Sequence, residues 1–120
     1  LQIRNDDGSV LVIAQSMAIV RHLSRKFNMI GDNETETIYA DMYSDHILDL
    51  FLEFVKYHFN KDEQAKQELK TKFFSETLPN NFGKLEKRLA NNDGRLSGSR
   101  FTYADVILNY FILINLTIRE

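Results

Sequence analysis

The chain opens with two short runs of β-prone residues on either side of a polar turn. Leu1–Arg4 and Val10–Ile13 flank the segment Asn5–Gly8, which ends in an Asp-Gly pair. An Asp-Gly pair between two such runs is a strong signal for a hairpin. Because a two-stranded hairpin is only marginally stable by itself, we expect these strands to belong to a larger sheet.

From Ser16 onward the hydrophobic spacing becomes helical. Ser16 is expected to cap a first helix, whose apolar residues lie mostly on one side and which should end at Gly31. Asn33 followed by Glu36 has the form of a capping box and predicts a longer helix that runs to about Phe59. The positions expected to be buried on this long helix are Ile38, Met42, Ile47, Leu48, Phe51, Leu52 and Val55.

Three further helices are predicted after the long one. The charged segment Lys61–Glu76 predicts an exposed helix, and Pro79 suits the first turn of another, which should end at the turn formed by residues 91–94. Thr102 lies three residues before Asp105 and directly before an apolar run. A hydroxyl at the cap and a carboxylate at the third helical position can satisfy two amide donors reciprocally. Because this last helix is apolar on nearly every side, we expect it at the centre of a bundle.

Composition and charge limit the classes of function. A length of 120 residues suits one domain or a piece of a larger one. Fifteen Lys and Arg against seventeen Asp and Glu give a net charge of -2, which argues against a nucleic-acid partner because phosphate binding needs concentrated positive charge. The absence of cysteine excludes disulfides, thiolate nucleophiles and Cys-type zinc sites. No apolar stretch reaches the length of about 20 residues that a bilayer span requires, so no membrane partner is expected.

Two segments of the chain resemble a known family. They are QSMAIVRHLSRKF at residues 15–27 and GSRFTYAD at residues 98–105, with YAD at residues 39–41 between them. Together they resemble the soluble glutathione transferases, most closely the sigma-like class. The resemblance implies an α+β fragment that is mostly α. Residues 1–30 would form the end of a thioredoxin-like, glutathione-binding domain, and residues 31–120 an incomplete α-helical domain that stops within its central helix.

The resemblance assigns glutathione binding to three residues. A helix N-terminus with a hydroxyl group and unpaired amides suits a carboxylate, and the family's Gln-Ser pair, which acts in this way, falls on Gln15 and Ser16. In sigma-like members an acidic residue of the neighbouring subunit holds the γ-glutamyl amine, and the matching position is Asp49. This assignment implies a homodimer. The alternative is that Ser16 only caps a helix, Gln15 lies in a solvated loop and Asp49 lies on a solvated helix face.

Four further residues receive roles from the resemblance. Phe51 and Val55, on the long helix, would form part of the wall of the pocket for the electrophile. Thr102 and Asp105 resemble the family's N-capping box, so Asp105 is interpreted as structural and not as a catalytic acid.

Acidic residues on the long helix raise the further alternative of a metal site. Asp45, His46 and Asp49 have a spacing that could suggest metal ligands, and some sigma-like members place a divalent cation among acidic interface residues. Here Leu48 replaces a third acidic residue. We therefore expect no metal requirement, and the alternative to an interface role for Asp45 and Asp49 is a solvated helix face.

The resemblance implies a cytoplasmic glutathione transferase, in which the thiolate of reduced glutathione, the co-substrate, attacks a hydrophobic electrophile. A free thiol titrates near pH 8.5, and in sigma-like members a Tyr near the N-terminus lowers the pKa of the glutathione thiol. All five tyrosines of this chain fall in predicted helices, so no residue here is assigned as catalytic, and the activating Tyr is expected upstream of Leu1. Three alternatives stay open: a glutathione-dependent isomerase of the prostaglandin synthase type, a non-catalytic structural or assembly subunit, and an unrelated helical domain.

Overall fold

The computed structural model describes residues 1–117, and the side chain of Leu116 and residues 118–120 of the expected second domain lie outside the description. The described part is mostly helical with one small sheet, as the fold class predicts. Its elements in chain order are β1 (Gln2–Arg4), β2 (Val10–Val12), α1 (Ser16–Lys26), α2 (Glu34–His58), α3 (Glu63–Lys72), η1 (Phe73–Thr77), α4 (Leu78–Ala90) and α5 (Tyr103–Thr117).

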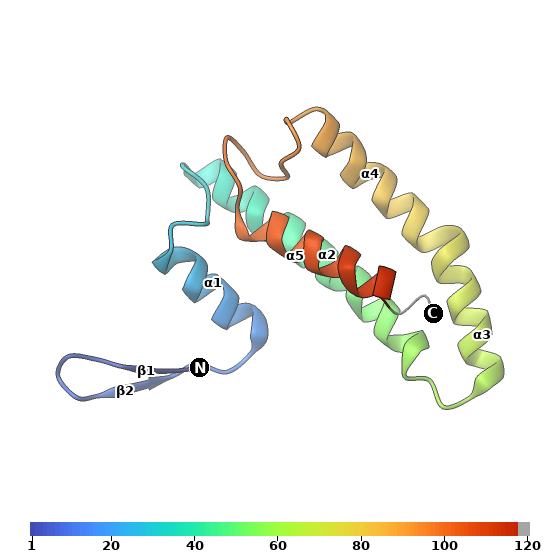
Figure 1. Ribbon diagram of the computed structural model, residues 1–120, viewed down its shortest axis with the longest axis horizontal. Coiled ribbons are helices and arrows are strands. Elements are labelled where there is room, and N and C mark those ends of the chain that lie inside the picture. The colour runs from blue at the N-terminus through green and yellow to red at the C-terminus, as the bar shows by residue number, and fades with distance from the viewer. Residues whose placement is uncertain (118–120) are drawn as a thin grey trace.

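The predicted hairpin is confirmed. β1 and β2 pair antiparallel with Ile3 opposite Leu11, and Gly8 takes a φ of 82° in the turn, a value that suits glycine. Within the described residues the sheet has these two strands only, so the expected larger sheet is not seen there. Figure 1 shows the hairpin extending away from the helices, and the side chains of Val10 and Val12 are exposed.

α2 is the central helix of the described chain. α5 lies along it, and α3, η1 and α4 return along its length as one helical run (Figure 1). The buried hydrophobic residues come mainly from α2 and α5: Ala40, Ile47, Leu50, Phe54, Tyr57, Phe73, Leu85, Leu96, Tyr103, Ala104, Leu108 and Phe111.

The buried face of α2 differs in part from the expected one. Ile47 is buried as predicted, but Ile38, Met42 and Leu52 are exposed. The small residues Ala40 and Ser44 are fully buried instead, and the Ser44 hydroxyl donates to the Ala40 carbonyl at 2.6 Å. Because apolar residues occur around most of α2, hydrophobicity alone did not identify the face that packs in the core.

The two helices predicted around Pro79 are continuous. A π-helical turn, η1, joins α3 to α4, and within it the Leu78 amide donates to the Phe73 carbonyl five residues earlier. Pro79 has no amide hydrogen and cannot continue the regular ladder. The wider π-helical turn accommodates this missing donor without breaking the helix. Proline and π-helical turns are both common causes of local helix distortion.

α1 ends earlier than predicted, at Lys26. Asn28 adopts a φ of 56° directly after the helix, which is the role expected for Gly31. Gly31 has a φ of 105°, and a Cβ at this position would lie 2.7 Å from the Cβ of Glu36. Gly31 is therefore required by the close approach of the loop to α2.

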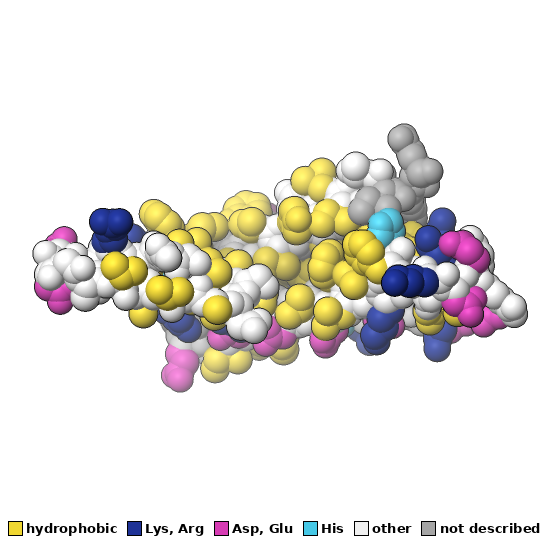
Figure 2. Space-filling view, turned by 90° about the horizontal axis from the view of Figure 1, so that it is seen from below, with side chains coloured by type: hydrophobic (Ala, Val, Ile, Leu, Met, Phe, Trp, Pro, Cys, Tyr) yellow, Lys and Arg dark blue, Asp and Glu magenta, His cyan; other side chains and the backbone are white. Residues whose placement is uncertain are grey.

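α5 is not buried on all sides among the described residues. Tyr103, Ala104, Leu108 and Phe111 are buried, whereas more than half of the surface of Val106, Tyr110 and Leu113 is exposed. The radius of gyration is 17.0 Å, compared with about 14 Å for a compact chain of this length. Figure 2 shows hydrophobic side chains across the middle of one face of the molecule. The described chain is thus an open half-bundle.

Candidate functional site

The N-terminus of α1 is held in an unusual backbone conformation. Gln15 has a φ of 72° and occupies the cap position, so the prediction that Ser16 caps the helix is wrong: Ser16 is the first helical residue. The Gln15 carbonyl accepts the Ile19 amide at 3.0 Å, and the Gln15 side chain makes no capping hydrogen bond. The first-turn amides of a helix have no partner within the helix. Both Gln15 and Ser16 are exposed, so this terminus is open to a ligand.

A left-handed conformation is uncommon for a residue with a long side chain. It costs on the order of 1–3 kcal/mol, and such conformations cluster at functional sites. At Gln15 it turns the chain sharply from the hairpin into α1. The amides at the start of α1 therefore lie at the bend between the hairpin and the helix, in one fixed orientation.

Arg21 connects α1 to two other helices. Its Nε donates to Asp41 Oδ1 at 3.0 Å, and its Nη2 donates to Asp45, both on α2. The hydroxyl of Tyr103, the first residue of α5, also donates to Asp41. Burial, followed by the bond to Asp41, raises the pKa of Tyr103 to about 12. These partners are 20 or more residues apart in sequence, and the sequence carried no signal for this network.

Asp49 lies on the exposed side of α2. It lines a hollow of about 440 Å³ between α2 and α4, together with His46, Leu50, Leu52, Glu53, Lys56, Thr77 and Asn81. Neither Gln15 nor Ser16 lines this hollow. The structure of one chain therefore does not bring Asp49 together with the other two predicted glutathione-binding residues.

Phe51 and Val55 are half-buried and pack against the core. The Phe51 ring stacks on Phe54 at 6.0 Å between centroids. Phe59 follows Val55 by four residues and is strongly exposed. Phe51, Val55 and Phe59 follow one another at i, i+4 spacing and so lie on one side of α2, and Phe59 was not selected from the sequence.

Asp105 is enclosed at the start of α5. Its Oδ2 accepts the Thr102 amide at 2.8 Å and its Oδ1 accepts the Leu96 amide at 2.8 Å. The bond from the Thr102 amide is the carboxylate half of the predicted capping box and is confirmed. In place of the other half, the Asp105 amide donates to the Thr102 backbone carbonyl at 3.2 Å, and the Thr102 hydroxyl pairs with the Asp105 carboxylate at 3.2 Å and with the Ser97 hydroxyl at 2.9 Å. All three polar groups are buried, so this carboxylate is occupied by structural hydrogen bonds.

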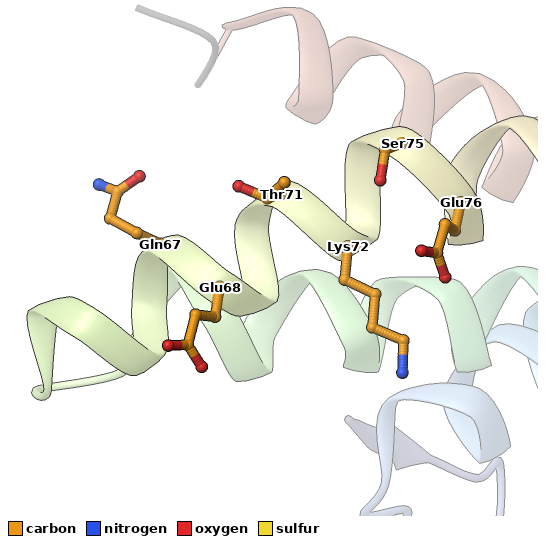
Figure 3. Close-up of a pocket in the computed structure, with 6 residues that line it drawn as sticks. All are labelled: Gln67, Glu68, Thr71, Lys72, Ser75 and Glu76. Atoms are coloured by element: carbon orange, nitrogen blue, oxygen red, sulfur yellow. The ribbon is translucent and has the colours of Figure 1, made fainter.

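A second hollow, of about 650 Å³, lies on the surface of α3 and η1. Its lining side chains are Gln67, Glu68, Thr71, Lys72, Ser75 and Glu76, all from one continuous helical run (Figure 3). None of the residues singled out from the sequence lines it. This hollow is a polar surface depression and not a site with converging chemistry.

Residues 1–117 carry neither a cluster of metal ligands nor a membrane-spanning helix. That part of the chain holds no group of three or more His, Cys, Asp or Glu side chains placed to bind a metal ion. Asp45, at the predicted metal-ligand spacing, pairs with Arg21. Within the same residues, no helix has the length and apolar character needed to cross a membrane.

Comparisons with known proteins agree on one family. Residues 48–118 match the family described as glutathione S-transferase, C-terminal domain. The chain is 38% identical over 99 residues to a glutathione S-transferase of Dirofilaria immitis, covering 80% of this chain and 46% of that protein. It is 38% identical over 103 residues to a glutathione S-transferase of Plasmodium falciparum, with the same coverage of 80% and 46%. The chain thus spans about half the length of the curated relatives it matches.

Two solved structures extend the similarity to nearly the whole chain. Prostaglandin synthase D of Nilaparvata lugens superimposes with a TM-score of 0.85 at 28% identity, covering 98% of this chain and 57% of that one. A Pi-class glutathione S-transferase of Onchocerca volvulus gives a TM-score of 0.75 at 31% identity, with coverage of 94% and 53%. The predicted fold class, a thioredoxin-like end followed by a helical domain, is confirmed by these matches.

Proposed function

The chain belongs to the glutathione S-transferase family, and from this membership we propose that the protein conjugates the thiolate of reduced glutathione to hydrophobic electrophiles in the cytoplasm. The observation that carries the proposal is the open N-terminus of α1, at the Gln-Ser pair that the family uses for glutathione. The sigma-like class stays a prediction, because the named relatives include a Pi-class enzyme.

We assign the γ-glutamyl end of glutathione to this terminus. The α-carboxylate would accept the free amides of the first turn, where the helix dipole favours a negative charge. The Ser16 hydroxyl can donate a further hydrogen bond to the same group, and the Gln15 side-chain amide can both donate and accept. The strained backbone of Gln15 supports this assignment, since it holds these donors in one orientation.

Asp49 is assigned to the γ-glutamyl ammonium of glutathione bound to a second subunit. A carboxylate facing an ammonium forms a charge-assisted hydrogen bond, which is stronger than a neutral one. A homodimer through α2 is supported by the exposed apolar side chains of Ile38, Met42 and Leu52 on the helix that carries Asp49. A hollow of about 250 Å³ adjoins this face and is lined by Met42, Tyr43, His46, Lys84 and Leu85.

Thiol activation is assigned to no residue of this chain. The Tyr103 hydroxyl is committed to Asp41, and its raised pKa, about 12, makes it a poor match for stabilising a thiolate at neutral pH. Phe51 and Val55, extended by Phe59, are proposed as part of the wall for the electrophile.

A glutathione-dependent isomerase is the second candidate. It is favoured by the similarity to the prostaglandin synthase of Nilaparvata lugens. A structural or assembly subunit without catalysis is the third. Conjugation and isomerisation differ in stoichiometry, because conjugation consumes one glutathione per turnover, whereas isomerisation returns glutathione unchanged. Counting free thiol against product in one assay separates them, and a protein that binds neither substrate supports the third.

The binding assignment is tested by calorimetric titration of the full-length protein with reduced glutathione. Ser16→Ala and Asp49→Ala should each weaken binding by about 1–3 kcal/mol, because each leaves a polar group of the ligand without its partner. Ser75→Ala and Asp6→Ala remove the same groups from exposed positions elsewhere and should change nothing. Unchanged affinity in both test variants would show that the residue assignment is wrong.

A further inference from the structure

Helix α1 carries the proposed glutathione site but has few polar links to the rest of the fold. Its apolar residues Met17 and Val20 pack against the core. One backbone bond, from the Tyr103 amide to the Met29 carbonyl at 3.0 Å, ties the loop after the helix to α5. Among the described residues, the side-chain hydrogen bonds from α1 to α2 all come from Arg21.

Arg21 binds two carboxylates on one side of α2. Asp41 and Asp45 are four residues apart, so they lie one turn apart on the same side of that helix. The Arg21 side chain is 27% exposed, less than either of its partners, and its planar group contacts both at once. Asp41 also accepts a hydrogen bond from the Tyr103 hydroxyl. The paired contact of the Arg21 guanidinium with Asp41 and Asp45, which we call the Arg21 fork, therefore joins α1, α2 and α5 at one point.

Arg21 does not lie at the open end of α1. It is five residues after Ser16, and a rise of about 1.5 Å per residue places it about 7.5 Å further along the helix axis. A side chain at that position fixes the orientation of the helix without lying at its first-turn amides. The Gln15–Ser16 terminus and the contact made by Arg21 thus lie on the same helix, about one and a half turns apart.

We propose that Arg21 is a positioning residue for glutathione: its fork onto Asp41 and Asp45 holds α1 in the orientation in which the Gln15–Ser16 terminus binds the γ-glutamyl carboxylate. This inference rests on the proposed function. Without the fork, α1 samples other orientations and the apparent affinity falls in proportion to the fraction of protein in which the helix is docked. Mutations at contacts of this kind alter coupling by about 2- to 30-fold, and we expect the middle of that range, about 3- to 10-fold, for Arg21.

The test is steady-state kinetics of the full-length protein, with glutathione and an electrophile such as 1-chloro-2,4-dinitrobenzene varied separately. Arg21→Met should raise the KM for glutathione about 3- to 10-fold and leave the KM for the electrophile and kcat at saturating glutathione unchanged. Arg21→Lys keeps the charge and loses the fork, and should give a smaller rise. Lys26→Met removes an exposed charge from the same helix and should have no effect.

Three results would overturn the proposal. An unchanged KM for glutathione in Arg21→Met shows that α1 needs no such support. An equal rise in the KM for glutathione and in the KM for the electrophile shows a general structural defect. An effect that disappears at higher protein concentration shows that Arg21 acts in subunit association. If Arg21→Met does not fold, Arg21→Lys and Tyr103→Phe decide the question in the same assay.

Ser16→Ala separates this inference from the function on which it rests. If Ser16→Ala raises the KM for glutathione and Arg21→Met does not, the site stands and the role of Arg21 is wrong. If neither variant changes it, both the site and the positioning role are wrong. Slower hydrogen exchange at Ile19 and Val20 in the natural protein than in Arg21→Met, at equal overall stability, would confirm that α1 is held in place.

Discussion

The N-terminus of α5 is closed by the chain's own groups, whereas the N-terminus of α1 is open. At α5 the chain uses its own groups, because Asp105 accepts the amides of Thr102 and Leu96 and the whole cluster is buried. At α1 no side chain caps the helix, and the preceding Gln15 is held at a φ of 72° on the surface.

The difference shows which helix terminus has amides that can still bind a ligand. A carboxylate that already accepts two buried amides is part of the fold, although its position beside an apolar run could suggest a catalytic acid. The terminus of α1 is exposed and its preceding backbone is strained, and because strained backbone clusters at functional sites, this terminus is the better candidate for binding a ligand. The two termini should therefore respond in opposite ways to mutation.

The largest effect is expected at the closed terminus. Asp105→Ala leaves the buried amides of Thr102 and Leu96 without acceptors, and each costs about 1–3 kcal/mol. We expect the free energy of unfolding, measured by urea denaturation, to fall by about 3 kcal/mol. Asp6→Ala, at an exposed turn, is the control and should change it by less than about 0.5 kcal/mol. A loss below about 1 kcal/mol for Asp105→Ala would contradict the structural interpretation.

A smaller effect of opposite sign is expected at the open terminus. Gln15→Gly should raise the free energy of unfolding by about 1 kcal/mol, because glycine adopts a positive φ without strain. It should also weaken glutathione binding, since the side-chain amide is lost. Gln67→Gly, within α3, is the matched control and should destabilise by about 1 kcal/mol. Destabilisation by Gln15→Gly would show that Gln15 is not strained in the way the structure indicates.

A third effect appears only at alkaline pH and concerns the first residue of α5. Burial and the bond to Asp41 raise the pKa of Tyr103 from 10.0 to about 12, so the folded protein keeps the phenol proton longer than the unfolded chain. The contribution of this pKa difference to the free energy of unfolding is fully present below pH 10 and is lost as the pH rises toward 12. Unfolding titrations across this range should show the loss in the natural protein and not in Tyr103→Phe. The same loss in both would assign it to another group.

Local signals predicted most of the elements. The hairpin turn, the N-terminus of α2 and the turn after α4 are determined by neighbouring residues, and the structure has them where expected. Asn33 accepts the Glu36 amide at 3.0 Å as predicted. The Glu36 carboxylate, however, accepts the amides of Asp32 and Ser99, the latter 63 residues away, and these bonds lower its pKa.

Contacts between distant segments could not be predicted in the same way. The buried face of α2 is selected by close packing at Ala40 and Ser44, which no hydrophobic pattern reveals. The Arg21 fork joins α1 to α2 through side chains that read as ordinary surface charges. For the candidate site, the family resemblance located Gln15 and Ser16, but the strain at Gln15 and the support by Arg21 are visible only in three dimensions.

The most direct test of the account is an amide NMR titration of the full-length protein. Reduced glutathione should shift the amide signals of Ser16, Met17 and Ala18, and leave those of Tyr103 and Ala104 at the closed terminus in place. Cysteinylglycine, which lacks the γ-glutamyl carboxylate, should not shift the first group. Unchanged signals at residues 16–18 at saturating glutathione, or equal shifts with cysteinylglycine, would contradict the central claim that the open terminus of α1 binds this carboxylate.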